Sequence, residues 1–190
     1  MSMILEAILT TATPDGGTHI APLGFRRENG FIVLSPFHPS RTLDNLRATG
    51  MAAISHPADV RIFAGCLTGR RDWPLVPCAQ VACGRLADAL SHSELIVERI
   101  EEDTVRPRFI CRELIHANHE AFPGHNRAQA AVIEACILVS RLGMLPADKV
   151  KQEMDYLAIA IGKTAGPREW EAWNWLKEKI DAHRQQEQAA

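Results

Sequence analysis

The sequence predicts a mainly β protein with a helical C-terminal part, and three observations lead to this fold class. Apolar residues alternate with polar ones in short runs over roughly the first 115 residues. Glycine, proline and asparagine separate these runs by connections too short for parallel crossovers. After Pro123-Gly124 the apolar period changes from two residues to 3.6, as in helices. We therefore expect an antiparallel β domain over residues 1–122 and a helical subdomain over residues 123–190.

The first three strands are expected to form a meander. Residues 4–11 alternate as a strand, and the turn that follows contains Gly16 and Gly17, which tolerate positive φ. A second strand covers residues 18–27, and Asn29-Gly30 closes a tight hairpin into a third strand over residues 31–34. Strands joined by such short turns pair in antiparallel fashion.

A short helix is expected after the third strand. Ser40 or Thr42 can cap its N-terminus, and Leu43 and Leu46 share its inner face. Gly50 is expected to end it. The remaining strands of the β domain are expected over residues 51–55, 79–90 and 108–115, with a short helix over residues 59–67 and either helix or strand over residues 94–102.

Three helices are expected in the C-terminal part. The first covers residues 127–142 and is apolar almost all round, which suggests burial on more than one side. The second covers residues 147–161 and ends at Gly162. The third begins at Pro167, a favourable first helical residue, and is expected to fray over residues 184–190.

Composition excludes several classes of protein. Of the 190 residues, 46% are hydrophobic and 23% charged, so the chain can bury a core without disulfides or a structural metal. The net charge of −2 argues against nucleic acid as a partner. No apolar run reaches the roughly 20 residues that span a bilayer, and the first residues make a poor signal peptide. Five cysteines without a paired spacing indicate reduced thiols, and we expect a cytoplasmic protein with no membrane partner.

Several well-known catalytic motifs are absent from the sequence. There is no GxGxxG fingerprint, no Walker loop, no GxSxG elbow and no HExxH pair. These absences, with the short early connections, exclude Rossmann and P-loop folds. No nucleophile or acid–base pair is visible either, so we assign no catalytic side chain.

The strongest local signal lies at the start of the predicted short helix, in Ser40-Arg41-Thr42. Backbone N–H groups, two hydroxyls and a guanidinium within three residues make a cradle suited to phosphate. His38, just before it, is either a further donor to phosphate or an ordinary loop residue. A capped helix with a surface arginine is the common alternative, and the residue pattern leaves both interpretations open.

Taken together, these segments resemble the FMN-binding split β-barrel proteins. The similar parts are the strand over residues 19–25, the hairpin strand after it, the helix start over residues 40–46 and the strand after Gly50. More narrowly, the chain resembles a domain-of-unknown-function branch from archaea and methylotrophic bacteria that has a helical C-terminal part. That branch carries a segment similar to Asn126-Arg127-Ala128, and the resemblance covers about residues 3–180.

The resemblance implies an antiparallel split β-barrel that binds FMN at the interface of a homodimer. The phosphate is expected at the helix start and the isoalloxazine ring against the second strand. There Gly24 would permit close approach of the cofactor, with a strand bulge as the alternative. Many split barrels carry a lysine near the phosphate, whereas this chain has only Arg41 there. The expected cofactor-binding residues are Ala21, Pro22, Gly24, His38, Ser40, Arg41, Thr42, Asn45, Asn126 and Arg127.

The function expected from this resemblance is that of an FMN-dependent oxidoreductase acting on a small-molecule redox substrate. FMN itself carries the redox chemistry, which fits a sequence without a visible nucleophile. A non-enzymatic flavin-binding protein or sensor would use the same residues. A zinc hydrolase built on His116, His119 and His125 is a third alternative, with the first two on one helical face. Their spacing matches no recognised zinc pattern, and we expect no metal.

Overall fold

The computed structural model describes residues 3–189, which divide into two compact units. The first, the barrel unit, comprises the chain up to Ala58 together with Trp73–Phe122. The second, the helical unit, comprises Asp59–Asp72 and the chain from Pro123 onward. The helical unit therefore includes a short segment from within the β-rich part of the sequence.

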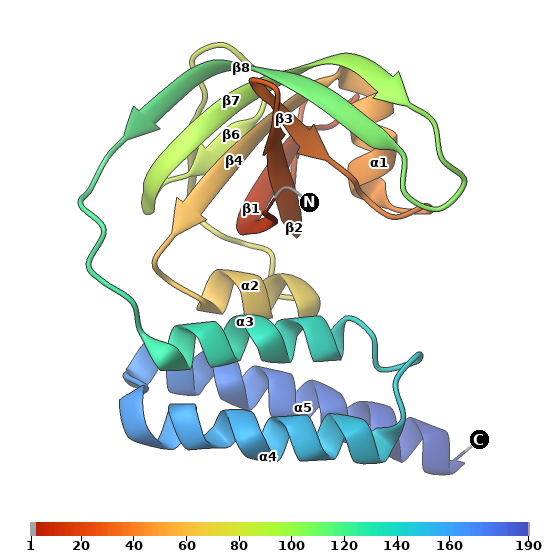
Figure 1. Ribbon diagram of the computed structural model, residues 1–190, viewed down its shortest axis with the longest axis vertical. Coiled ribbons are helices and arrows are strands. Elements are labelled where there is room, and N and C mark those ends of the chain that lie inside the picture. Colours follow the sequence, from red (N-terminus) through yellow and green to blue (C-terminus); the bar gives the residue numbers. More distant parts are fainter. Residues whose placement is uncertain (1–2, 190) are drawn as a thin grey trace. The chain divides into compact units, whose positions relative to one another are not determined.

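The barrel unit is built on a closed barrel of six strands in the order β1-β2-β3-β8-β7-β4 (Figure 1). Every neighbouring pair is antiparallel. Two further strands, β5 and β6, form a separate hairpin. The predicted antiparallel split barrel, followed by C-terminal helices, is confirmed. The strands are β1 Leu5–Ala12, β2 Thr18–Glu28, β3 Phe31–Leu34, β4 Met51–Pro57, β5 Leu75–Pro77, β6 Gly84–Leu86, β7 Ala89–Glu101 and β8 Arg108–Asn118.

The inside of the barrel is filled by the alternate residues of its strands. Leu9 and Phe25 are examples from β1 and β2, and both are buried. Helix α1 (Arg41–Thr49) adds Leu43 and Leu46 to the same core, as its spacing predicts. Burying each such side chain stabilises the fold by about 1.5–3 kcal/mol. This core holds the strands and α1 in fixed positions.

Helix α1 has both of the predicted end signals. At its start, the Ser40 hydroxyl oxygen accepts a hydrogen bond from the Leu43 N–H at 3.2 Å. At its end, Gly50 adopts φ 65°, the left-handed conformation that glycine tolerates best. The Gly50 N–H donates to the Leu46 carbonyl at 3.0 Å, which closes the helix.

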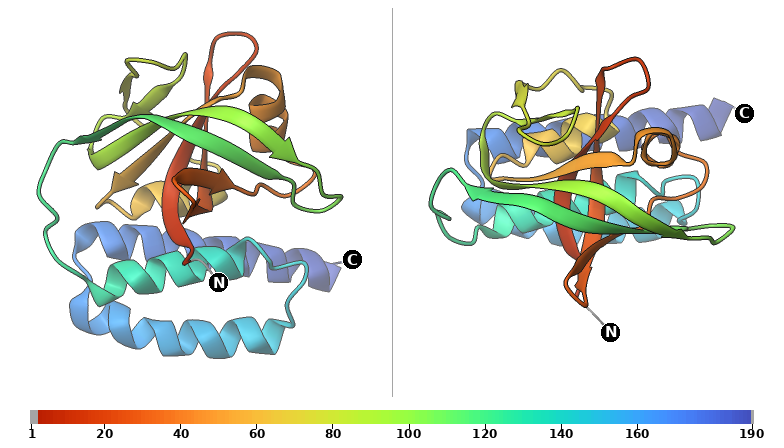
Figure 2. Two further views of the ribbon diagram at one scale, coloured as in Figure 1. Left: turned by 45° about the horizontal axis from the view of Figure 1, so that its top comes forward. Right: turned by 90° about the horizontal axis from the view of Figure 1, so that it is seen from above.

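The helical unit contains α2 (Arg61–Leu67), α3 (Arg127–Val139), α4 (Ala147–Thr164) and α5 (Pro167–Ala189). Helices α3, α4 and α5 lie side by side, and α2 packs against α3 and α5 (Figure 2). Small apolar residues occupy most of the circumference of α3, which accounts for its predicted burial on more than one side. The buried residues of α3 are Ala128, Ala131, Val132, Ala135, Cys136, Leu138 and Val139.

Two predictions for the β domain need correction. The strand expected over residues 79–90 is not continuous: residues 79–83 form the turn of the β5–β6 hairpin, β6 covers Gly84–Leu86 alone, and β7 begins at Ala89. The ambiguous residues 94–102 belong largely to strand β7, which pairs with β4 on one side and β8 on the other. The short helix expected over residues 59–67 is present as α2.

Two helix ends also differ from prediction. Helix α3 ends at Val139, before the predicted Leu142, because a turn begins at Ser140. Helix α4 continues through Gly162 to Thr164, and the chain becomes extended only at Ala165. Helix α5 remains helical to Ala189, so the predicted fraying is not seen there, and Ala190 lies outside the described residues.

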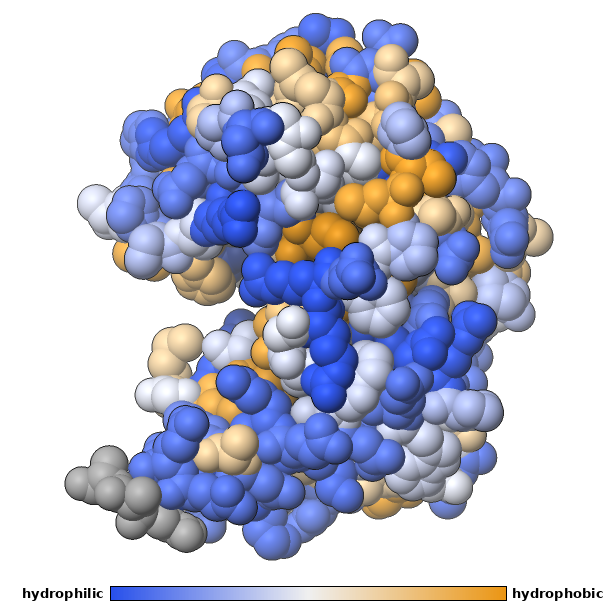
Figure 3. Space-filling view, turned by 180° about the vertical axis from the view of Figure 1, so that it is seen from behind, coloured by the Kyte–Doolittle hydropathy of each residue, from blue (hydrophilic) through white to orange (hydrophobic). Residues whose placement is uncertain are grey.

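On the face shown in Figure 3, hydrophobic residues are interspersed with hydrophilic ones over the barrel unit, whereas the helical unit is mainly hydrophilic. Within residues 3–189, no helix combines the length and the apolar character that a bilayer crossing requires.

Candidate functional site

The loop that leads into α1 is fixed by the connection between β7 and β8. The His38 N–H donates to the Val105 carbonyl at 2.9 Å. The Arg106 guanidinium donates to the Ser35 carbonyl from Nε at 3.1 Å and from Nη2 at 2.9 Å. It also lies 4.2 Å from the centre of the Phe37 ring, a cation–π distance. The entry into α1 is therefore held by backbone and side-chain contacts from another part of the barrel.

The first turn of α1 concentrates positive electrostatic potential. The unpaired N–H groups of a helix start carry a partial positive charge, and Arg41 adds a full one as the first helical residue. Its side chain is exposed, and within residues 3–189 it forms no salt bridge. A cation in this position is unfavourable for the helix itself, whereas an anion bound there would be stabilised by both charges.

Asp15, in the turn between β1 and β2, is an acidic residue whose pKa is affected by the charge of Arg41. Hydrogen bonds from the Thr13 hydroxyl and then from the Gly17 N–H lower the pKa of Asp15, and the charge of Arg41 lowers it further. Asp15 is therefore ionised at neutral pH. It competes weakly with any anion for Arg41, because both side chains are exposed to water.

Thr42 and Asn45 point toward the barrel rather than outward. Both side chains are buried, and the Asn45 amide Nδ2 donates to the Thr11 hydroxyl at 2.9 Å. This hydrogen bond attaches α1 to strand β1. Of the residues predicted to hold phosphate, the exposed His38 and Arg41 and the helix start itself are thus the groups available to a ligand from solvent.

The strand segment predicted to face the flavin ring lies in β2, within the same unit as α1. Ala21 and Pro22 are half-buried. A Cβ at Gly24 would lie 2.8 Å from Ile4 Cγ2 and 3.1 Å from Glu6 Oε1. The β1–β2 register runs through this position without a shift, so the strand-bulge alternative for Gly24 is wrong. The close neighbours of Gly24 are side chains of its own unit.

Asn126 and Arg127 belong to the helical unit, where they begin α3. The Asn126 side-chain oxygen accepts hydrogen bonds from the N–H groups of Ala128 at 2.7 Å and Gln129 at 3.4 Å. Its Nδ2 donates to the Thr164 carbonyl at 3.1 Å, which ties α3 to the end of α4. Arg127 is exposed as the first helical residue. Asn126 thus serves as the cap of α3.

The three histidines of the zinc alternative do not form a metal site. Strand β8 extends to Asn118, so His116 lies on a strand and the shared helical face is wrong. His116 Nδ1 pairs with the Ser93 hydroxyl at 3.0 Å, whereas His119 Nε2 pairs with His92 Nδ1 at 3.0 Å. His125 lies in the other unit. Among residues 3–189, no three His, Cys, Asp or Glu side chains converge on a point that could hold a metal ion.

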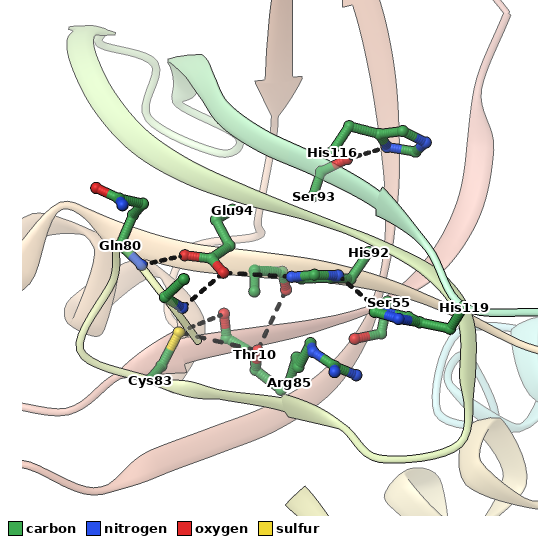
Figure 4. Close-up of polar contacts among 12 residues, drawn as sticks. Thr10, Ser55, Gln80, Cys83, Arg85, His92, Ser93, Glu94, His116 and His119 are labelled. Atoms are coloured by element: carbon green, nitrogen blue, oxygen red, sulfur yellow. Dashed lines mark hydrogen bonds and ion pairs between the residues drawn. The ribbon is translucent and has the colours of Figure 1, made fainter. Parts of the chain in front are cut away.

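Sequence reasoning missed a buried polar cluster under the β5–β6 hairpin, centred on Glu94 of β7 (Figure 4). Glu94 is 1% exposed. Its carboxylate accepts hydrogen bonds from the N–H groups of Ala79 at 2.8 Å and Gln80 at 2.6 Å, and it contacts His92 Nε2 at 3.3 Å. Burial raises the pKa of the Glu94 carboxyl, but these three partners together lower it below its usual value. Glu94 is thus a buried, ionised anchor for the hairpin.

The same cluster connects Glu94 to the surface through two histidines. An ionised carboxylate only accepts hydrogen bonds, so Nε2 of His92 carries the proton in this pair. Nδ1 of His92 then accepts from Nε2 of His119, whose ring is exposed and stacks on that of His92. Partial desolvation, followed by the charge of Arg85, lowers the pKa of His119. His119 is therefore neutral at pH 7.

Two more hydrogen bonds dock the hairpin on the barrel. The Leu86 N–H donates to the Ser55 hydroxyl at 3.2 Å, and the Gly84 N–H donates to the Thr18 hydroxyl at 2.9 Å. The sequence does contain the spacing His92-x-Glu94, which puts both side chains on one face of a strand. It gives no sign of the loop N–H groups that make a buried carboxylate favourable there.

The closed antiparallel barrel with a capped helix after its third strand gives the chain the split β-barrel fold. The chain belongs to the DUF447 family, described as proteins of unknown function: the model of the family's N-terminal domain matches residues 5–120, and a second DUF447 model matches residues 126–178. No curated protein sequence matches the chain.

Solved structures support the same fold. The FMN-bound protein MM1853 from Methanosarcina mazei, also of DUF447, is 17% identical with a TM-score of 0.81, over 94% of this chain and 96% of that one. A flavoredoxin from Methanosarcina acetivorans is 11% identical with a TM-score of 0.52, over 62% and 69% of the two chains. The NADH:FAD oxidoreductase SgcE6 of Streptomyces globisporus is 13% identical with a TM-score of 0.51, over 60% and 75%.

Proposed function

We propose that the protein is an FMN-binding flavoprotein whose α1 N-terminus holds the phosphate of the cofactor. The observation that carries this proposal is the exposed Arg41, which has no salt-bridge partner among residues 3–189 and lies at a helix start where backbone N–H groups also favour an anion. The similarity to an FMN-bound protein of the same family supports the choice of ligand.

The residues present fit a terminal phosphate. The helix start and the Arg41 guanidinium supply charge-assisted donors, which bind phosphate oxygens more strongly than neutral donors do. The loop before α1 is braced by Arg106 and by the bond from His38 to Val105, so these donors are held in place before the ligand arrives. The half-buried Ala21 and Pro22 of β2 are the residues we expect beside the flavin ring.

For the reaction, we propose that the flavoprotein is an oxidoreductase that passes electrons to or from a small molecule. When bound, FMN supplies hydride or single-electron transfer, while the protein binds and orients it. Several structures with a similar barrel are redox proteins by name, among them a 2-nitrobenzoate nitroreductase from Pseudomonas fluorescens and a styrene monooxygenase flavin reductase from Pseudomonas putida. Their similarity supports this proposal without identifying the substrate.

We further propose that the protein acts as a homodimer, with a second copy covering the flavin. Phe37 and Val105, which flank the start of α1, are 53% and 56% exposed. Large apolar side chains beside a ligand site are typical of surfaces that are covered by a partner.

The five cysteines are free thiols, which supports a cytoplasmic location.

Titration of the purified full-length chain with FMN tests the central proposal. We expect a shifted flavin absorbance spectrum, quenched flavin fluorescence and about one FMN per chain. Mass spectrometry of the released ligand distinguishes FMN from FAD. Finding no flavin binding after reconstitution would refute the proposal, and finding only FAD would refute the choice of cofactor.

Two further measurements test the proposed oxidoreductase activity and the proposed homodimer. Anaerobic addition of NADH or NADPH should bleach the flavin absorbance if the protein is an oxidoreductase; an unchanged spectrum with both donors, and with a chemically reduced viologen, favours a non-enzymatic flavin binder. Light scattering of the FMN-bound protein should give twice the monomer mass. A monomer that retains full affinity for FMN would rule out the shared site.

A further inference from the structure

Cys78 and Cys83 face each other at the tip of the β5–β6 hairpin. The antiparallel register of this hairpin pairs Leu75 with Leu86, Val76 with Arg85 and Pro77 with Gly84. The next pair in the same register is Cys78 with Cys83, and the Cys78 N–H donates to the Cys83 carbonyl at 3.3 Å. The two cysteines are thus directly opposite each other, although four residues separate them in the sequence.

This geometry brings the two sulfur atoms together. Residues that face each other across a hydrogen-bonded antiparallel pair have Cα atoms about 5.5 Å apart. Disulfides span Cα separations of about 4.4–6.8 Å. The two thiols also hydrogen-bond to each other. A disulfide could therefore form here without a rearrangement of the hairpin.

The two thiols occupy different environments. Cys78 is half-buried at the edge of a small apolar cluster, whereas Cys83 is 4% exposed and its thiol contacts the Thr10 carbonyl. The hydrogen bond between the sulfurs lowers the pKa of Cys83 and raises that of Cys78, so the pair shares one proton.

The remaining cysteines lack these properties. Burial raises the pKa of Cys66 to about 11 and those of Cys111 and Cys136 to about 12, which keeps all three thiols protonated. All three are buried. Among the described residues, Cys78 and Cys83 are the two cysteines that face each other across a strand pair.

We propose that Cys78 and Cys83 form a redox-active dithiol site that exchanges electrons with low-molecular-weight disulfides. This inference is independent of the proposed flavin function. The thiolate forms first on Cys83, whose pKa is the lower, but that sulfur is buried, so the half-buried Cys78 is the nucleophile. The Cys78 proton passes to the Cys83 thiolate through their hydrogen bond, and the Cys78 thiolate then attacks one sulfur of the small disulfide RSSR. A Cys78–SR bond forms, the bond within RSSR breaks, and RS⁻ leaves.

The second step closes the disulfide within the chain. The Cys83 thiol gives its proton to the departed RS⁻, and its sulfur attacks that of Cys78. The bond between Cys78 and Cys83 forms and a second RS⁻ is released, which takes the other proton from solvent. In sum, two thiols are oxidised by two electrons, and one RSSR is reduced to two RSH.

Oxidation at this site acts on the loop that carries the partners of Glu94. The disulfide would close a ring around residues 79–82, and the N–H groups of Ala79 and Gln80 are the donors to the buried carboxylate. Fixing this loop should slow the exchange of those two amide protons with solvent. The redox state of the hairpin tip is thereby linked to the cluster of Glu94 and His92.

To test this proposal, the reduced full-length protein is equilibrated in a series of buffers, each with a defined ratio of reduced to oxidised glutathione. The thiols are then alkylated at low pH, and intact mass and non-reducing peptide maps are recorded. We expect a loss of two hydrogen masses, one crosslink between the peptides of Cys78 and Cys83, and full reversal by dithiothreitol. Hydrogen exchange should slow at Ala79 and Gln80 in the oxidised form.

The variant Cys78→Ser should form no intrachain disulfide, whereas the matched variant Cys66→Ala, which removes a buried cysteine of the helical unit, should oxidise like the original chain. Peptide maps of the original chain decide the question even if a variant fails to fold. A crosslink between other cysteines, a stable glutathione adduct at Cys78, or a chain that stays fully reduced in oxidised glutathione would each overturn the proposal.

Discussion

The N-termini of α1 and α3 carry the same sequence signal but differ in how many hydrogen bonds the capping side chain makes within the protein. Each begins with an arginine directly after a polar cap, Ser40-Arg41 in one and Asn126-Arg127 in the other. The Ser40 hydroxyl accepts one backbone N–H, that of Leu43. Asn126 accepts two and donates to a carbonyl of another helix as well.

This difference shows how a capping motif can be structural at one helix and available to a ligand at another. The Asn126 side chain caps α3 and also donates to the end of α4, so it holds the two helices together. At α1 the cap satisfies fewer donors, and a braced loop presents Arg41 to solvent. We therefore assign the phosphate to α1 and a mainly structural role to the start of α3.

The largest expected effect comes from Arg41→Ala. Losing a charge-assisted contact to phosphate costs about 1.5–3 kcal/mol, which is about ten- to hundred-fold in FMN affinity. Fluorescence titration with FMN measures this change directly. Arg41→Lys should restore part of the affinity, since lysine keeps the charge but lacks the planar fork.

Arg47→Ala is the matched control for Arg41→Ala. Arg47 lies in the last turns of the same helix, and its ion pair with Glu102 at 2.6 Å is exposed. The substitution removes the same charge and costs at most about 1 kcal/mol of stability. FMN affinity should stay within about twofold of the original. An equal loss of FMN affinity in both variants would show that the total positive charge of the protein, rather than the start of α1, determines binding.

The next largest effect is on stability, in Asn126→Ala. Removing an N-cap side chain costs about 0.5–2 kcal/mol of unfolding free energy, and the bond to Thr164 is lost as well. Urea denaturation should show this loss, while FMN affinity changes little. Asn126→Asp keeps the acceptor for the two N–H groups and loses only the donor, so it should be less destabilised. A variant with unchanged stability but weak FMN binding would reverse our assignment for α3.

The smallest effect is expected from Arg127→Ala, which removes the same residue type from the same helical position as Arg41→Ala. An exposed arginine at a helix start contributes little to stability, within about 0.5 kcal/mol. We expect less than about a threefold change in FMN affinity on calorimetric titration. A loss as large as that of Arg41→Ala would mean that both helix starts bind the cofactor, as the family resemblance implied.

Local signals made much of the fold predictable. The Asn29-Gly30 turn, the Ser40 cap and the Gly50 end of α1 each depend on neighbouring residues alone, and all three are confirmed. Prediction failed at the β5–β6 hairpin, because its strands are short and its turn contains no glycine. It also failed at Gly162, since a glycine permits a helix end without requiring one.

The site was predictable only in part, for a different physical reason. Ser40-Arg41-Thr42 is contiguous, so its position at a helix start could be inferred. The bracing of that loop by Arg106 depends on residues brought together by the barrel, and the burial of Glu94 depends on the β5–β6 hairpin, whose turn supplies its N–H partners. Such long-range partners leave no local pattern. The pairing of Cys78 with Cys83 is local, but it became visible only from the register of a hairpin that the sequence did not predict.

The measurement that tests the central claim most directly compares the affinities of FMN and riboflavin for the original chain and for Arg41→Ala. The two ligands share the flavin ring and differ by the phosphate alone. We expect the original chain to prefer FMN by about ten- to hundred-fold or more, given the strength of charge-assisted bonds. In Arg41→Ala most of this preference should disappear while riboflavin affinity is unchanged. Equal affinities in the original chain, or a preference that survives the substitution intact, would contradict a phosphate held at the start of α1.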